Sequence, residues 1–204
     1  MNLFTRIICL ALLLSAFVFF FFQTTINSQS ARQDKALTRE AERITGDEFE
    51  YSTKTPKGTR VVSVREASPE MIAAIDKGLD DLFAIAKSGK YKFSNRLTHS
   101  SYTIFISNAD RQKNADGNYS PDIAVDANQY AGTVYDKGGY IYAAGMIVAL
   151  NPCAFVIAEH TKDFNRVSEV VRYETEHLVL YHNDRKAFRE TMDHSKGGGH
   201  PILD

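Results

Sequence analysis

Residues 170–184 read VVRYETEHLVLYHND, a stretch typical of a helix in which charged residues interrupt the apolar positions. At about 100° per residue, Glu174 falls near the middle of an apolar stripe and His177 lies on its edge. A carboxylate in a buried stripe is costly unless it is paired or acts as a base, and no Arg or Lys lies on this stripe. Glu176 is expected on the opposite, solvated face. The stripe consists of Val167, Val170, Val171, Leu178 and Tyr181.

Residues 173–177, Tyr-Glu-Thr-Glu-His, resemble the HExxH helix of the zincin metallopeptidases, with tyrosine in place of the first histidine. In that family two helical histidines bind zinc, and the intervening glutamate polarises the water that attacks a peptide carbonyl. Carried over by position, the resemblance implies that Glu174 is the general base and His177 a zinc ligand. Tyr173 stands where the family has its other helical ligand.

The C-terminal tail holds further candidate ligands. Of the six histidines of the chain, four fall between positions 177 and 200. Three glycines at 197–199 allow a sharp return of the backbone, so His194 and His200 are candidate zinc ligands. His182 lies about 140° from His177 on a continuous helix, and we expect it to share a metal only if the helix breaks at Tyr181. A structural network of histidines and carboxylates and a disordered tail are the other interpretations.

The N-terminus predicts export. Residues 7–22, IICLALLLSAFVFFFF, carry no charge and follow Arg6. The run is slightly shorter than the roughly 20 residues that span a bilayer, although it can extend to Leu3. It predicts either a membrane anchor over residues 3–22 or a cleaved signal that ends at Ser28-Gln-Ser30. Both place the rest of the chain outside the cytoplasm, in the periplasm or the extracellular space.

The remaining pattern indicates an α+β class. We divide the chain into a hydrophobic segment (1–30), a polar, helix-prone stalk (31–47) and one α+β domain with a histidine-rich tail (48–204). The zincin resemblance implies a small, mostly antiparallel sheet, a backing helix and a C-terminal active-site helix.

Local signals place the expected elements of this domain. A helix is expected from Ser68-Pro69-Glu70 to about Lys87, and Asn165 or Ser168 is expected to cap the helix that carries Glu174. Strands are expected at 49–53 and 59–64 around a turn at 56–58, and at 102–107. A hairpin of 130–135 with 140–150 is expected to turn at 137–139, and 154–158 to form a short strand or helix.

Composition limits the function. The formal net charge is −1, and acids and bases are interspersed without a basic stripe, which argues against a nucleic-acid partner. The exported part has one cysteine, Cys153, which excludes an intrachain disulfide there and is expected to be buried.

Two functions follow from these observations. The zincin resemblance implies a membrane-tethered or secreted zinc-dependent hydrolase that acts on a peptide or protein substrate. The alternative is a non-catalytic exported domain, derived from such a fold, that binds an envelope or extracellular protein.

Overall fold

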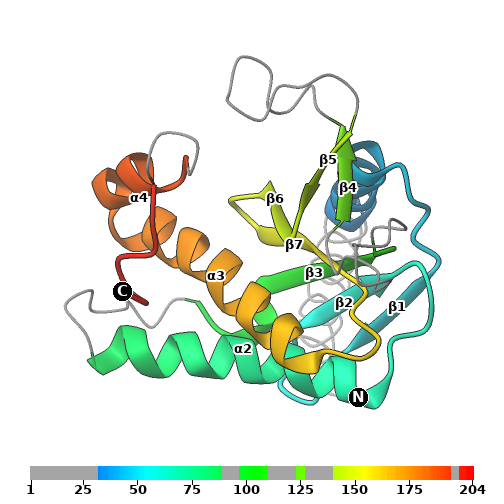
Figure 1. Cartoon of the computed structure of the whole chain (residues 1–204), viewed down its shortest axis with the longest axis horizontal. Helices are drawn as coiled ribbons and strands as arrows, with labels where there is room; N and C mark the ends of the chain where they lie inside the picture. Colours follow the sequence, from blue (N-terminus) through cyan, green and yellow to red (C-terminus); the bar gives the residue numbers. More distant parts are fainter. Residues whose placement is uncertain (1–31, 89–96, 110–122, 127–139, 194–197) are drawn as a thin grey trace, which may run out of the picture. The chain divides into compact units, whose positions relative to one another are not determined.

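The computed structural model describes residues 32–88, 97–109, 123–126, 140–193 and 198–204 (Figure 1). Contacts divide the chain into two compact units, Met1–Arg39 and Glu40–Asp204, and the elements named below belong to the second. Within the described ranges, no helix combines the length and the apolar character that a membrane span requires. The expected anchor at residues 3–22 lies outside those ranges.

A five-stranded mixed sheet, in the order β1-β2-β3-β7-β6, organises the Glu40–Asp204 unit. The pairs β1–β2 and β7–β6 are antiparallel, whereas β2–β3 and β3–β7 are parallel. The α+β class is therefore confirmed, but the expected mostly antiparallel sheet is wrong, because long connections place the three central strands parallel. The strands are β1 (Tyr51–Lys54), β2 (Arg60–Ser63), β3 (Tyr102–Ser107), β6 (Gly145–Ala149) and β7 (Cys153–Ala158).

Strands β3 and β7 are buried along their whole length. Their sequences, YTIFIS and CAFVIA, are nearly continuous apolar runs, as expected for parallel strands that are covered on both faces. Ile104 and Phe155 lie in the main core, whereas Phe105 meets the ring of Phe49 at a centroid distance of 5.2 Å. This confirms the strand predicted at 102–107 and shows that the segment at 154–158 is a strand.

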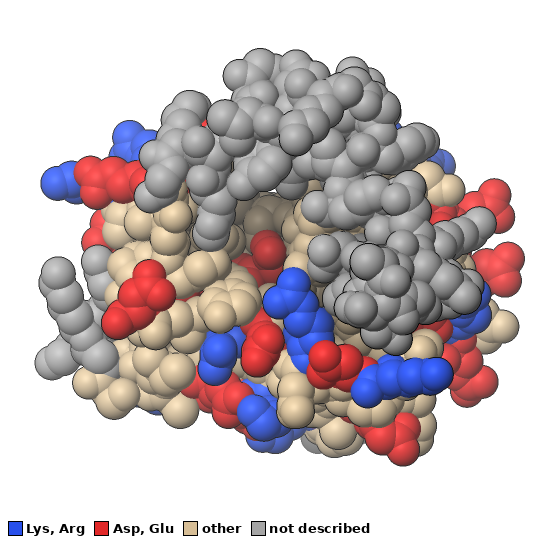
Figure 2. Space-filling model, in the orientation of Figure 1, with Lys and Arg blue, Asp and Glu red and all other residues tan. Residues whose placement is uncertain are grey.

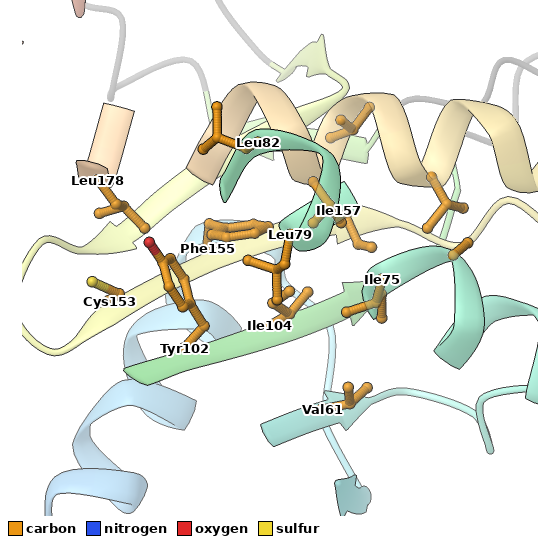
Figure 3. Close-up of a cluster of buried hydrophobic side chains, with 14 of the residues drawn as sticks. Val61, Ile75, Leu79, Leu82, Tyr102, Ile104, Cys153, Phe155, Ile157 and Leu178 are labelled. Carbon is orange, nitrogen blue, oxygen red and sulfur yellow. The ribbon is translucent and has the colours of Figure 1, made fainter. Parts of the chain in front are cut away.

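Helix α2 (Pro69–Ser88) has the predicted beginning and end. The Ser68 hydroxyl accepts a hydrogen bond from the Met71 backbone N–H at 3.2 Å, which satisfies one of the free donors of the first turn. Its buried face includes Ile75, Leu79 and Leu82, which belong to the main core together with Leu178 (Figure 3).

Helix α3 (Phe164–Asn183) packs against α2 and against β7 and β6. A Cβ atom at Gly78 of α2 would lie 2.6 Å from the Ser168 carbonyl oxygen, so glycine lets the two helices approach closely. Asp163 caps α3 by accepting from the Arg166 backbone N–H at 3.0 Å. The expected caps, Asn165 and Ser168, are therefore wrong, because α3 begins before both of them.

The segment 140–150 differs from the expected single strand. It forms β5 (Tyr140–Ala143) and then β6, and β5 pairs with β4 (Ile123–Asp126) in a separate two-stranded antiparallel sheet. The other half of the expected hairpin, 130–135, and its turn at 137–139 lie outside the described residues.

Lys and Arg are interspersed with Asp and Glu over the face shown in Figure 2.

Candidate functional site

Helix α3 is buried on two faces rather than one. The face with Val167, Val170 and Leu178 packs into the main core, as expected, although Tyr181 is only partly buried. A second face is covered by the C-terminal residues and by α4 (Arg185–Thr191), a helix that the sequence did not predict. The expectation that Glu176 is solvated is wrong, since its side chain is 0% exposed.

Glu176 holds the C-terminal segment against α3. Its Oε2 lies 3.0 Å from His200 Nδ1, and its Oε1 accepts a hydrogen bond from the Ile202 backbone N–H at 2.7 Å. An ionised carboxylate only accepts, so Nδ1 of His200 then carries a proton, and Nε2 of the neutral ring has the lone pair. The same hydrogen bond fixes the orientation of the ring, as carboxylates do for metal-binding histidines.

Three side chains meet at this point, and we call Tyr173, His177 and His200 the ring cluster. The His200 ring lies 4.9 Å from the His177 ring and 4.5 Å from the Tyr173 ring, centroid to centroid. The structure thus brings together one residue of the tail and the two helix positions that match the zincin ligand positions. His194 lies outside the described residues.

His182 has a different environment. Helix α3 continues past Tyr181, and His182 Nε2 lies 2.9 Å from the Leu150 carbonyl oxygen and 3.6 Å from Cys153 Sγ. The buried position expected for Cys153 is confirmed. Burial raises the pKa of the Cys153 thiol to about 12, so the thiol stays protonated near neutral pH and is a poor nucleophile.

Glu174 lies against strand β6. A Cβ atom at Gly145 would lie 2.6 Å from both Cγ and Oε1 of Glu174, so any other residue at 145 would force this carboxyl group to shift. Part of Glu174 remains accessible, yet removal from bulk water raises the pKa of the carboxyl group to about 7. A positive charge on the His200 ring would act in the opposite direction and is the smaller effect.

The shifted pKa of Glu174 predicts a pH dependence of stability. The pKa is about 7 in the folded chain against the usual 4.5, so this group favours folding below pH 4.5 and loses that effect as the pH rises through 7. As the pH rises from 4.5 to 8, the unfolding free energy of Glu174→Gln should therefore increase relative to that of the wild type by up to about 3 kcal/mol. Urea unfolding with a chelator present measures this difference, and a difference that does not change with pH would contradict the shift.

The donor atoms of the ring cluster suit zinc in part. Imidazole nitrogen is a preferred zinc ligand, and the hydrogen bond that His200 Nδ1 donates to Glu176 gives the His200 ring the orientation that such a ligand needs. Within the described ranges, no three His, Cys, Asp or Glu side chains are grouped to hold a metal ion. His177 and His200 therefore supply two imidazoles, and the other sequence candidate, His194, lies outside the described residues.

Comparison with known proteins gives no further guide. No protein-family model, curated protein or solved structure matches the chain.

Sequence reasoning missed Glu176 and Gly145. Leu178-Val179-Leu180 was the available signal for Glu176, because three successive apolar residues cannot share one stripe and so indicate a second covered face. A glycine inside a strand pattern, Gly145, was the signal for a close approach to the backbone.

Proposed function

We propose that the chain is an exported zinc-dependent hydrolase of peptidase type, with Glu174 as the general base. The proposal rests on the contact between the ring of His200, from the C-terminal segment, and the ring of His177 on α3. The same helix carries Glu174, whose carboxyl group is desolvated. The chain would be tethered through residues 3–22, or secreted after cleavage, and would act outside the cytoplasm on a peptide or protein.

Each residue of the site would have a separate role in binding or positioning the zinc ion. His177 and His200, with His194, would hold the zinc ion. Zinc, when bound, supplies Lewis acidity toward a carbonyl oxygen and toward a water molecule. Glu176 would keep the His200 ring in position through the hydrogen bond that it accepts from Nδ1.

Glu174 has the properties of a general base. A base works best when its pKa lies near the working pH, because it is then ionised yet still able to accept a proton. The pKa of Glu174 is raised to about 7 by desolvation, although the residue as a whole is only partly buried. Glu174 would take the proton from the attacking water and pass it to the leaving amine.

Zinc content tests this proposal. The full-length protein in lipid nanodiscs should bind zinc stoichiometrically, and His177→Ala, His194→Ala and His200→Ala should each lose it on dialysis. His182→Ala is the matched control and should keep the metal, because His182 pairs with the Leu150 carbonyl instead. A wild-type protein that takes up no zinc from a zinc-containing buffer would refute the proposal.

A second candidate function has its own support. Tyr173 packs on the His200 ring and Glu176 hydrogen-bonds to His200 Nδ1, and both are contacts that a purely structural network would also make. The chain would then be a non-catalytic exported domain that binds an envelope or extracellular protein. Metal-free protein whose folding is unchanged by His177→Ala would favour this alternative.

A further inference from the structure

A cavity of about 540 Å³ opens beside His177. Strand β6 and the segment after it form one wall, with Ile147 and Leu150, and helices α3 and α4 form the other, with Tyr181 and Phe188. Pockets that bind small molecules are typically of this size. Because this cavity adjoins His177, a proposed zinc-binding residue, it is well placed to hold part of the substrate.

The lining of this cavity is uncharged. The described residues that line it include no Lys, Arg, Asp or Glu, and most of them are aliphatic or aromatic. A larger cavity of about 860 Å³ between β1 and α2 differs in this respect, because the ion pair Lys57–Asp80 lines it and no member of the ring cluster does. The cavity at His177 is therefore the one that suits an uncharged group.

The α4 wall is held in place, and its far end is open to solvent. Asp184 caps α4 by accepting from the Lys186 and Ala187 backbone N–H groups, and Phe188 meets the Tyr181 ring edge-on at 5.2 Å. Met192, at the end of α4 and on the rim of the cavity, is 49% exposed. An exposed flexible thioether at the edge of an apolar pocket can adapt to a bound apolar group.

We propose that this cavity binds a large uncharged side chain, aromatic or long aliphatic, of the peptide substrate. The inference rests on the proposed function and deepens it, because it names the class of residue next to the bond that is cleaved. Burial of an aromatic side chain against such a lining releases far more free energy than burial of alanine. A carboxylate in the cavity would lose its hydration and find no charged partner among the described lining residues.

Peptide binding measured without turnover tests the inference. The probe is an acetylated and amidated glycine peptide with one central 4-fluorophenylalanine, observed by ¹⁹F NMR with the full-length protein in nanodiscs and a chelator. Saturable binding to the wild type is expected, and unlabelled phenylalanine peptide should displace the probe at least about 10-fold better than alanine or aspartate peptides. Met192→Asp should weaken binding at least about 10-fold.

Tyr51→Asp is the matched control, because Tyr51 is another exposed large apolar residue and does not line this cavity. Equal weakening by both substitutions, equal displacement by all three peptides, or no saturable binding would overturn the inference. Selective peptide binding by a protein that hydrolyses no peptide would support the binding inference and refute the proposed hydrolase function. Hydrolysis without preference for large apolar residues would support the hydrolase function and refute the binding inference.

Discussion

Replacing Glu174 by glutamine is expected to reduce peptide hydrolysis about 10³-fold while zinc stays bound, because the amide cannot take a proton from water. Glutamine has nearly the same shape, so the close packing against Gly145 is preserved. Turnover is measured by mass spectrometry on a defined peptide mixture, and metal content is measured on the same sample.

The control for this substitution is Glu169→Gln, which changes an exposed carboxylate on the same helix and should leave turnover unchanged. Wild-type turnover in Glu174→Gln would exclude Glu174 as the base. Loss of zinc together with turnover would mean that Glu174 acts on the metal site rather than on water.

Replacing His200 by alanine is expected to lower the free energy of unfolding by about 3 kcal/mol in the presence of a chelator. The substitution leaves the carboxylate of Glu176 fully buried with one of its two donors removed. It also removes the ring contacts with Tyr173 and His177. Urea unfolding measures the change.

A double-mutant cycle identifies the cause of this loss. Glu176→Ala combined with His200→Ala should cost clearly less than the sum of the single changes, by about 1.5 kcal/mol or more. Glu190→Ala, at an exposed carboxylate of α4, is the control and should cost under about 0.5 kcal/mol. Additive effects at positions 176 and 200 would show that the two side chains do not stabilise each other.

The sequence predicted the elements whose signals are local. Ser68 and Pro69 mark the start of α2, and the apolar run 102–107 forms a buried strand, because capping and continuous burial depend on neighbours in the chain. The mixed pairing of the sheet could not be obtained in this way, since it depends on where long connections cross.

The site was predictable in part, for a related reason. Helical spacing placed Glu174 near the middle of a buried stripe, whereas the residue is only partly buried and lies against Gly145, with a raised pKa. Spacing also placed Glu176 in solvent, because a helical wheel shows one buried face and cannot show that residues 198–204 cover the other. That contact lies 24 residues away in the chain, beyond any local pattern.

The central claim is that zinc is held between helix α3 and the C-terminal segment. A crystal structure of the zinc-loaded protein, with diffraction recorded on both sides of the zinc absorption edge, tests it most directly. We predict an anomalous peak within bonding distance of His177 and of Nε2 of His200, about 2.0–2.1 Å from each nitrogen. No peak there, with the His200 ring still bonded to Glu176 and packed on Tyr173, would contradict the account.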